Sequence, residues 1–577
     1  MSTTLKVYVN EDDALLFWSI PQPIPGCRGF AIERKRRVAN QPEERAFLNN
    51  RTGFENEKVA AQPKKDQPAV LKPSTEWPFQ RFSWTDHDAN TGDSVSYRVV
   101  PVLRDSAGKL VLDEGNASPF SDEKILGNAP DARFAPFFNR GFVISQFMSR
   151  FLAENGLDFN SKTDMTKFKK ELGKKETQIR QFLSGDLRIA LLDLLESAHK
   201  DGGEVFGALF EVSDDELIEA LAKLGERAHI VLANGSITAA KGERSAAARK
   251  RDENEEARAT LRAAGVDVTR KDRFISPGAL GHNKFLVITD KNGKPAMVWT
   301  GSTNWATTGL CTQVNNGLLI RDPAVAKIYR KQWQRLFDAK SGFDGLAEAN
   351  STPKPAGDDV IVWFTRASGS TDLEALQAEV KNAKEGILFL MFMPGSAGLF
   401  STVAARSGDP SLYVRGVATE LPNGQADPSV ADINLVDGAN HTPIQFDMIQ
   451  AQGLKNPMAR FVAEVTRNQF VANIGHAIIH SKVIVIDPFS DNPVVIAGSH
   501  NYSTTASTKN DENFIIIKGD RDLAEAYAVN VMGAFAHYRW RAFVGKTKKP
   551  FNGLRDNDTW QAPKLKAEAN ELRFWGV

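Results

Sequence analysis

The sequence contains few cysteines, no long apolar run and almost no net charge. Cys27 and Cys311 are its only cysteines and lie far apart, which argues against a disulfide scaffold and suits a reducing compartment. No segment approaches the run of ~20 apolar residues that spans a membrane, and acidic residues stand where a secretory signal has its apolar core. The 72 basic and 71 acidic residues leave a net charge of +1, so any basic substrate site must be local. We expect a cytoplasmic protein without a membrane span, or one exported without a cleaved signal peptide.

Length and composition predict several folded domains. At about 150 residues per domain, a chain of 577 residues corresponds to about three or four units. The 42% hydrophobic and 25% charged residues match a globular protein and exclude collagenous or wholly disordered chains. The chain is therefore long enough to bury several separate cores.

Residues 1–128 contain short β-like runs separated by Pro, Gly, Asn and Asp. The arrangement around Trp18, Trp84 and Tyr97 resembles a fibronectin type III or immunoglobulin-like domain. The resemblance implies an all-β sandwich in which Tyr97 is the corner tyrosine.

After residue 128 the pattern changes to helices that alternate with buried strands. It predicts a helix over 186–199, a strand over 205–212, a helix over 214–224 and a strand over 228–233. This βαβ order implies a parallel or mixed sheet covered by helices.

Residues 350–359 are rich in Pro, Gly and small polar residues and are typical of a linker. The pattern after this linker repeats the pattern before it, which predicts a fold class of α/β with two pseudo-symmetric α/β/α lobes after an all-β sandwich. The expected boundaries are 129–349 for the first lobe, 360–548 for the second lobe and 549–577 for a C-terminal tail.

Two parts of the chain repeat each other in detail. GHNKFLVITD followed by GSTNWATTGL in the first half matches IHSKVIVID followed by GSHNYSTTAS in the second. At offsets of 197 or 198, the alignment pairs His282 with His480, Lys284 with Lys482, Gly301 with Gly498, Ser302 with Ser499, and Asn304 with Asn501. A register this constant indicates an internal duplication, so we expect a pseudo-twofold axis that brings equivalent residues together.

The repeated residues suit a phosphodiester. His and Lys at alternate positions of an extended strand point to the same face, and the hydroxyl and amide of a GSxN loop can bond an anion's oxygens. One imidazole would attack phosphorus while the other protonates the leaving group. We expect Lys284, Lys482, Asn304 and Asn501 to hold the phosphoryl oxygens. Ser302 and Ser499 are expected to support the loops and, with Asn315, to bind substrate.

The two HxK motifs with downstream GSxN loops resemble the phospholipase D superfamily over roughly residues 130–548. The resemblance implies a two-lobed fold, phosphodiester transfer without a metal or other cofactor, and a covalent phosphohistidine. It also implies an Asp five residues after each Lys, which Asp487 provides, whereas Thr289 stands there in the first copy. We interpret Asp290 as the counterpart of Asp487, displaced by a local bulge.

Glu512 and Asn315 occupy equivalent positions of the repeat, so the two imidazoles have different supports. A carboxylate bonded to Nδ1 stabilises the imidazolium and raises the pKa of the ring, whereas an amide orients it without favouring the charge. We therefore expect His480, supported by Glu512, to be the general acid. We expect His282 to lie near Asn315 and to be the nucleophile.

The sequence leaves the substrate class open. The small net charge and an apolar stretch at 391–400 favour a phospholipid, while Lys and Arg in 163–180 and 241–273 make a DNA or RNA endonuclease the alternative. For 241–273 the favoured interpretation is a solvated helix of mixed charge. A non-catalytic scaffold on a decayed enzyme fold is a third candidate. Because one chain supplies both half-sites, a monomer is sufficient for one active site.

Overall fold

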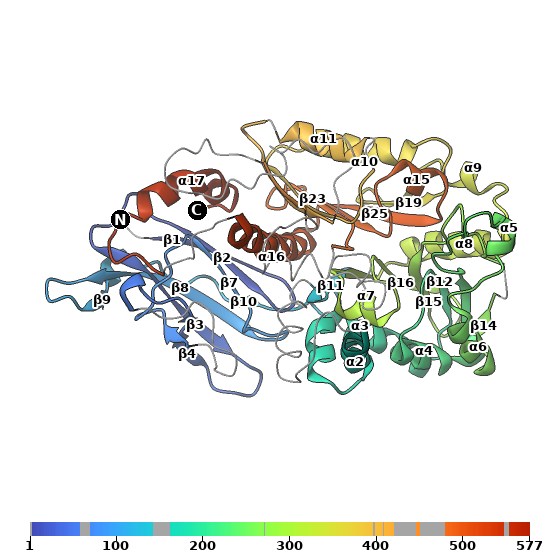
Figure 1. Ribbon diagram of the computed structural model, residues 1–577, viewed down its shortest axis with the longest axis horizontal. Helices are drawn as coiled ribbons and strands as arrows, with labels where there is room; N and C mark the ends of the chain where they lie inside the picture. The colour runs from blue at the N-terminus through green and yellow to red at the C-terminus, as the bar shows by residue number, and fades with distance from the viewer. Residues whose placement is uncertain are drawn as a thin grey trace. The chain divides into compact units, whose positions relative to one another are not determined.

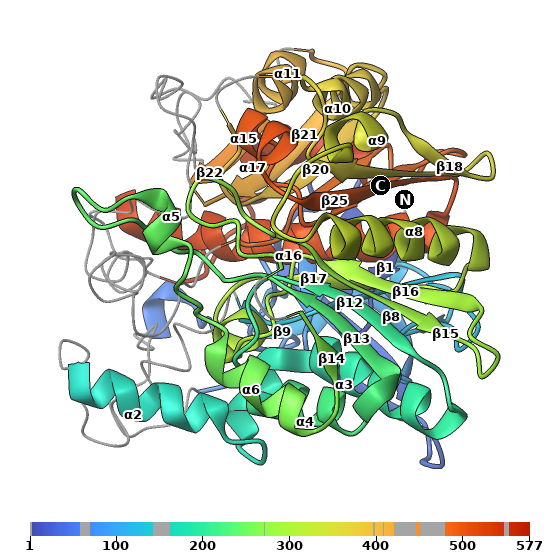
Figure 2. The ribbon, with the colours of Figure 1, turned by 90° about the vertical axis from the view of Figure 1, so that its right-hand side faces the viewer.

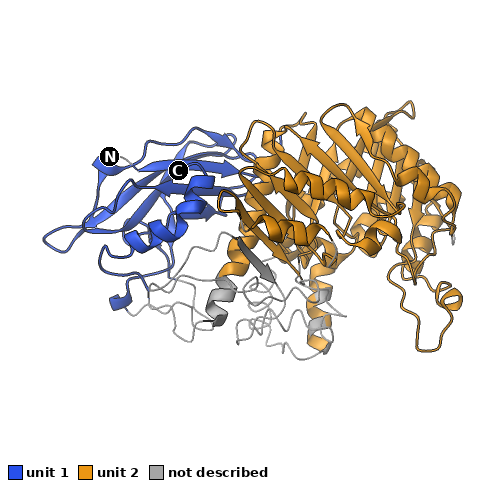
Figure 3. Ribbon diagram, turned by 90° about the horizontal axis from the view of Figure 1, so that it is seen from above, with its two compact units in different colours: residues 1–128, 434–445, 546–577 blue, residues 129–433, 446–545 orange. Residues whose placement is uncertain are grey.

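The computed structural model describes residues 3–57, 70–141, 162–269, 272–395, 398–407, 409–419, 446–450, 479–546 and 553–577. These residues form two compact units, shown in Figures 1 and 3. Unit 1 takes its described residues from 1–128 and 546–577, and unit 2 takes them from 129–433 and 446–545. Among the described helices, none is long and apolar enough to cross a membrane.

Unit 1 is built on two antiparallel sheets. The first has the order β1-β2-β7, with β1 (Thr4–Val9), β2 (Ala14–Ser19) and β7 (Ser83–Asp86). The second has the order β10-β8-β3-β4, with β9 paired to β8; it contains β3 (Cys27–Arg37), β4 (Glu44–Phe47), β8 (Ser94–Arg104), β9 (Leu110–Leu112) and β10 (Lys124–Ile125). A small ladder joins β5 (Asn49–Asn50) to β6 (Lys72–Pro73). The predicted all-β region is therefore present at the N-terminus.

Aromatic side chains fill the core of unit 1. The Trp18 ring from the first sheet lies 5.7 Å from the Phe30 ring of the second, measured between centroids. The C-terminal segment, expected to be a tail, carries α17 (Gln561–Phe574) and then Trp575, whose ring stacks on Phe17 at 4.7 Å. Burial of such large rings contributes several kcal/mol to folding, about 1.5–3 kcal/mol per side chain.

Tyr97 is buried in unit 1, but its contact differs from the expected tyrosine corner. Its hydroxyl donates to Oδ2 of Asp86 at 2.8 Å, and Arg34 donates to the same carboxylate oxygen at 2.8 Å. A corner tyrosine bonds to nearby backbone instead. The hydroxyl bonds to a carboxylate here because a buried carboxylate such as Asp86 costs free energy unless hydrogen-bond donors surround it.

The first lobe of unit 2 is a seven-stranded mixed sheet of order β11-β17-β16-β15-β12-β13-β14. Its strands are β11 (Phe134–Phe138), β12 (Val205–Leu209), β13 (Ala228–Leu232), β14 (Asp267–Val268), β15 (Lys284–Thr289), β16 (Pro295–Gly301) and β17 (Asn316–Ile320). Its helices are α2 (Lys162–Gly173), α3 (Gln178–Asp201), α4 (Asp215–Ala222), α5 (Ser245–Ala248), α6 (Glu255–Ala263), α7 (Thr307–Cys311), α8 (Pro323–Ala339) and α9 (Leu346–Asn350). The predicted parallel βαβ unit is present, because β12 and β13 pair in parallel.

The second lobe has the sheet order β18-β19-β25-β24-β23-β20-β21-β22. Its strands are β18 (Lys354–Ala356), β19 (Val360–Thr365), β20 (Gly386–Met391), β21 (Tyr413–Ala418), β22 (Phe446–Gln450), β23 (Val483–Ile486), β24 (Val494–Gly498) and β25 (Glu512–Lys518). Its helices are α10 (Thr371–Lys381), α11 (Leu399–Arg406), α15 (Thr504–Thr508) and α16 (Arg521–Lys546). Apart from the added edge strand β18, this order is the order of the first sheet, so the predicted duplication is confirmed.

Figure 2 shows α8 and α16 running between the two sheets, with α3, α4 and α6 below the first sheet and α10 and α11 above the second. Reciprocal hydrogen bonds join the lobes: Tyr329 of α8 donates to Oδ1 of Asn513 at 3.1 Å, and Nδ2 of Asn316 donates to Tyr527 of α16 at 2.9 Å. Tyr329 and Tyr527 are equivalent in the repeat, as are Asn316 and Asn513. The pairs exchange partners across the interface, as a pseudo-twofold axis requires.

The predicted bulge near Thr289 is present, since the pairing of β15 with β16 changes register between Ile288 and Thr289. The proposed counterpart of Asp487 is nevertheless wrong. Asp487 accepts hydrogen bonds from backbone amides at the start of β20, and Thr289 Oγ1 accepts the equivalent bond from Glu204 N, just before β12, at 2.9 Å. Asp290 instead shapes the next turn by accepting from Lys294 N at 2.9 Å. A hydroxyl can replace the carboxylate because only one amide needs a partner there.

Candidate active site

The start of one central strand in each lobe positions an HxK motif. His282 and Lys284 stand at the start of β15, and His480 and Lys482 stand just before β23. Each lysine bends back so that Nζ donates to the carbonyl oxygen of its own histidine; this distance is 2.7 Å for Lys284. All four side chains are almost completely buried, at 4% exposure or less.

The structure brings the two imidazoles together although 198 residues separate them in the chain. The ring centroids of His282 and His480 are 6.5 Å apart. Because one ring comes from each lobe, the space between the rings is shared by the two HxK motifs. This is the convergence that the duplication predicts.

The supports of the two rings are exchanged relative to the sequence-based expectation. Nδ1 of His282 bonds to Oε2 of Glu512 at 3.1 Å, and Nδ1 of His480 bonds to Oδ1 of Asn315 at 2.9 Å. The expected pairing of Glu512 with His480 is therefore wrong. Alignment of the repeats shows which residues are equivalent, but each support crosses the interface to the ring of the other lobe.

Both supports are fixed by further hydrogen bonds. Oε1 of Glu512 accepts from Nδ2 of Asn510 at 2.9 Å. Oδ1 of Asn315 also accepts from the Ser302 hydroxyl at 2.7 Å, and its Nδ2 donates to the carbonyl of Gly309 at 2.8 Å. Because these bonds identify Oδ1 of Asn315 as the acceptor, the proton of neutral His480 lies on Nδ1. Nε2 is then the nitrogen that can contact a substrate.

The GSxN loops are held tightly against the neighbouring strands. A Cβ added to Gly301 would lie 2.3 Å from the carbonyl oxygen of Asn316, and one added to Gly498 would lie 2.4 Å from that of Asn513. Only glycine fits such an approach. Ser302 and Ser499 are completely buried, and Asn513 N donates to the Ser499 hydroxyl at 3.1 Å. Ser302, Ser499 and Asn315 thus support the loops. Their contacts are with the protein itself and do not bear out the expectation that they bind substrate.

The asparagines of the two GSxN loops, Asn304 and Asn501, have polar atoms that remain available to bind a substrate. Nδ2 of Asn304 donates to Oε2 of Glu211 at 2.7 Å, which leaves one further amide hydrogen. Oδ1 of Asn304 and Oδ1 of Asn501 are buried atoms without a hydrogen-bond partner among the described residues. Unpaired buried polar atoms cost stability unless a ligand or water satisfies them, so both asparagines have capacity for a ligand.

Phe210 and Phe392 were not found from the sequence. Each follows a central strand, β12 or β20, and its ring lies beside the HxK motif of the same lobe. Phe210 is 4.7 Å from the His282 ring and 4.7 Å from Nζ of Lys284, and Phe392 is 5.0 Å from the His480 ring and 4.9 Å from Nζ of Lys482. Extending the repeat upstream would have matched these residues at an offset of 182. Their faces stabilise the two ammonium groups.

The site has the electrostatics of an anion-binding site. Burial lowers the pKa of Lys284 to about 7 and lowers that of Lys482 well below its usual value. Burial and the charge of Lys284 lower the pKa of His282 to about 4. Burial and the charges of both lysines lower the pKa of His480 well below the usual value. A bound anion would offset the crowded positive charge and restore protons to these groups.

Glu512 is the carboxylate of this centre. Burial alone would raise its pKa, but the charge of His282 and the hydrogen bond between them lower it to about 2. The group is therefore ionised at neutral pH. Within the described ranges, no three His, Cys, Asp or Glu side chains cluster in a way that could hold a metal ion. The two lysines are the cations that the structure places at the centre.

Comparison with known proteins agrees with this geometry. The family described as "Cardiolipin synthase, PLD-like domain" matches residues 191–337 and 431–531. The described residues of the first segment lie in the first lobe, and residues 446–450 and 479–531 of the second segment lie in the second lobe. The match supports the phospholipase D superfamily. No curated protein matches the sequence.

Solved structures with similarity to the chain share little sequence with it. A polyphosphate kinase from Porphyromonas gingivalis is 10% identical, with 99% of this chain and 82% of that chain covered and a TM-score of 0.39. A phosphatidylserine synthase from Haemophilus influenzae Rd KW20 is 10% identical, with 68% and 94% covered and a TM-score of 0.37. The phospholipase D family member Nuc from Salmonella typhimurium is 18% identical, with 32% and 96% covered and a TM-score of 0.19.

Proposed function

We propose that the chain is a phosphodiesterase that hydrolyses a phospholipid through a phosphohistidine on His282. The observation that carries the proposal is the pair of facing imidazoles, 6.5 Å apart, each fixed at Nδ1 by a side chain of the opposite lobe. With Nδ1 occupied, Nε2 of each ring is the atom that can act on a phosphoryl group between them. The PLD-like match supports chemistry of this class.

Glu512 favours His282 as the nucleophile. When neutral Nε2 attacks phosphorus, an N–P bond forms, the bond to the leaving oxygen breaks, and the ring becomes cationic with its proton still on Nδ1. A carboxylate on Nδ1 stabilises this cation and holds the tautomer that leaves Nε2 unprotonated. The carboxylate therefore marks the nucleophile, whereas the sequence-based expectation was that it marks the general acid.

His480 is the general acid and base. Because Asn315 is neutral, it does not stabilise an imidazolium at His480, so the protonated ring gives up its proton readily to the leaving alkoxide. In the second step His480 takes a proton from water, the water oxygen bonds to phosphorus and the N–P bond breaks. The cycle ends with a phosphomonoester, an alcohol and both rings in their starting states.

Lys284 and Lys482 hold the non-bridging oxygens and stabilise the charge that develops on them. With the phosphate bound and their protons restored, the two lysines supply positive charge beside the imidazoles. The remaining amide hydrogen of Asn304 and the amide group of Asn501 add donors from the GSxN loops.

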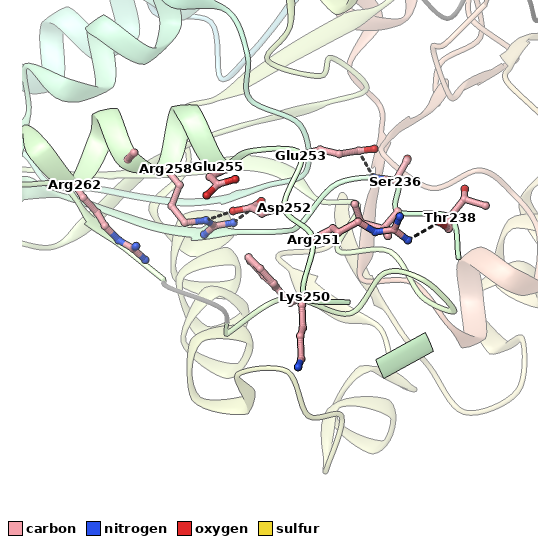
Figure 4. Close-up of a pocket in the computed structure, with 12 residues that line it drawn as sticks. Ser236, Thr238, Lys250, Arg251, Asp252, Glu253, Glu255, Arg258 and Arg262 are labelled. Carbon is pink, nitrogen blue, oxygen red and sulfur yellow. Dashed lines mark hydrogen bonds and ion pairs between the residues drawn. The ribbon is translucent and has the colours of Figure 1, made fainter. Parts of the chain in front are cut away.

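The choice of a lipid rests on the surroundings of the site. Met393 directly follows Phe392, whose ring contacts His480, and this methionine is 41% exposed. In the described part of the charged segment 241–273, Arg251 pairs with Glu243 and Arg258 pairs with Asp252, as Figure 4 shows for the second pair. An exposed methionine beside the site and two arginines already paired with carboxylates favour a lipid over a polynucleotide backbone.

The experiment is turnover of bis(p-nitrophenyl) phosphate in chelator, followed by parallel assays on phospholipid vesicles and on single- and double-stranded DNA. His282→Ala and His480→Ala should abolish turnover of the generic diester. His199→Ala, a change at an exposed histidine of α3, is the matched control and should have no effect. Lipid cleavage without DNA nicking supports the proposal, whereas cleavage of DNA alone would identify an endonuclease. If no diester is turned over, the result would favour the non-catalytic binding or scaffold protein.

A further inference from the structure

His500 is a buried histidine that the proposed reaction does not use. It occupies the variable position of the second GSxN loop, between Ser499 and Asn501, and is completely buried. Nδ1 of its ring accepts a hydrogen bond from Tyr502 N at 3.0 Å. Because a backbone amide can only donate, Nδ1 carries the lone pair and the single proton of the neutral ring lies on Nε2.

Two buried side chains hold the ring in this state. Nε2 of His500 lies 3.0 Å from Oδ2 of Asp372, in the first turn of α10, and the Ser507 hydroxyl of α15 donates to the same oxygen at 2.7 Å. Burial alone would raise the pKa of Asp372, but the hydrogen bonds from His500 and Ser507 lower it below its usual value. The ionised carboxylate accepts the proton on Nε2 and so keeps Nδ1 as the acceptor.

The first lobe holds the equivalent amide with a backbone carbonyl. Trp305, the counterpart of Tyr502, donates its amide hydrogen to the carbonyl of Glu211 at 2.9 Å. In the second lobe the neighbouring chain lies farther away: the bond from Gly395 N to the Tyr502 carbonyl is 3.4 Å long, whereas the equivalent bond of the first lobe is 2.8 Å long. The imidazole of His500 therefore takes the place of the Glu211 carbonyl.

The direction of the Asn501 side chain depends on this bond. Tyr502, the next residue, has a φ of 54°, in the left-handed region that a tyrosine enters only when its surroundings hold it there. In the first loop Glu211 holds Nδ2 of Asn304, but among the described residues no hydrogen bond fixes the Asn501 side chain, whose Oδ1 is buried without a partner. The Asn501 amide is therefore aimed by its backbone, which the bond to His500 fixes.

We propose that His500, held by Asp372 and Ser507, is a positioning residue that aims the Asn501 amide at a phosphoryl oxygen. The inference rests on the proposed phosphodiesterase function and extends it. The two GSxN loops are held by different means, a backbone carbonyl in the first lobe and a histidine–aspartate pair in the second. In this role His500 acts through the backbone of residues 501 and 502 and not on the substrate.

The test separates the two nitrogens of the ring. The amide oxygen of an asparagine can take the place of Nδ1, whereas the amide of the longer glutamine reaches the place of Nε2. His500→Asn keeps an acceptor for Tyr502 N, so kcat with bis(p-nitrophenyl) phosphate should stay within about threefold of that of the unmodified protein. His500→Gln keeps a donor for Asp372 but loses that acceptor, so kcat should fall by about tenfold or more, with KM changed much less.

A double-mutant cycle shows whether the loss passes through Asn501. Asn501→Ala should lower kcat to a similar extent, and adding His500→Gln should lower it by no more than about twofold further. Thr303→Val is the matched control, because it removes the polar atom at the equivalent position of the first loop while Trp305 N keeps its backbone acceptor. Its kcat should change by less than about threefold.

Two kinetic results would overturn the inference. One is that the losses of His500→Gln and Asn501→Ala multiply in the double variant, and the other is that His500→Gln is faster than His500→Asn. Either result would mean that the ring only fills space or serves Asp372. Thermal melts show whether each variant is folded, and failure of His500→Asn to fold would count against the inference in the same way.

The tautomer of His500 gives a second, independent measurement. Nitrogen-15 NMR of the histidine rings in the unmodified protein should show a neutral ring with its proton on Nε2, identified as the signal that is absent from His500→Asn. A proton on Nδ1 would contradict the inference. Turnover of the diester at full kcat in His500→Gln would refute this inference alone, whereas failure of the unmodified protein to turn over any diester would refute the proposed function and the inference with it.

Discussion

Replacing Glu512 by Gln tests how the structure stabilises the phosphohistidine. The substitution keeps the shape of the side chain and a carbonyl oxygen for Nδ1 of His282, but removes the negative charge. The hydrogen bond is 3.1 Å long and Glu512 is completely buried. Two unit charges about 4 Å apart interact by about 4 kcal/mol at an effective dielectric constant of about 20. At ~1.4 kcal/mol per factor of ten, kcat/KM should fall by about three orders of magnitude.

The pH profile separates this electrostatic role from a loss of structure. Glu512 raises the pKa of His282, which burial and Lys284 hold at about 4, so removing the carboxylate charge lowers that pKa further. The acid limb of kcat/KM for bis(p-nitrophenyl) phosphate should therefore move to lower pH in Glu512→Gln. Asn315→Leu, at the equivalent position, removes no charge and should leave that limb in place. A folded Glu512→Gln variant within about threefold of the unmodified enzyme would refute the reasoning.

Three further predictions concern charge and stability. Burial lowers the pKa of Lys284 to about 7, so its ammonium charge is lost as pH rises through about 7, and kcat/KM should decline above that pH in a pH–rate profile. Arg273 and Asp511 form a pair between lobes with both side chains 2% exposed, so Arg273→Leu should destabilise by about 3–5 kcal/mol in thermal unfolding, and adding Asp511→Leu should recover part of the loss. Asp487→Ala leaves several backbone amides unpaired and should cost about 2 kcal/mol or more, whereas Asp290→Ala, in an exposed turn, should change stability by only about 0.5 kcal/mol; denaturant titration distinguishes them.

The repeat made the overall design of unit 2 predictable. Matching HxK and GSxN motifs at a constant offset implied two similar lobes, and the shared strand order and the facing rings of His282 and His480 follow from that. The bulge near Thr289 was visible as a misplaced Asp in the motif. These features depend on local sequence and on symmetry alone.

Features that depend on side-chain reach across an interface were not predictable in the same way. Glu512 lies in the second copy but bonds to the histidine of the first, and an alignment contains no information on that crossing. Thr289 takes the position in the first lobe that Asp487 has in the second, because one hydroxyl is enough to accept from the single amide there. Only the backbone geometry shows this. Glu211 was missed because no motif includes it, although its difference from Met393 appears once the repeats are extended.

Trapping the covalent intermediate tests the central claim directly. His480→Ala should attack bis(p-nitrophenyl) phosphate, whose leaving group needs no proton, and then accumulate the adduct because water is no longer activated. After quenching in neutral denaturant and digestion with trypsin, mass spectrometry should find p-nitrophenyl phosphate on residues 274–284, the peptide that contains His282. The result that would contradict the account is an adduct on His480 in the unmodified protein, or turnover in which His282 is never modified.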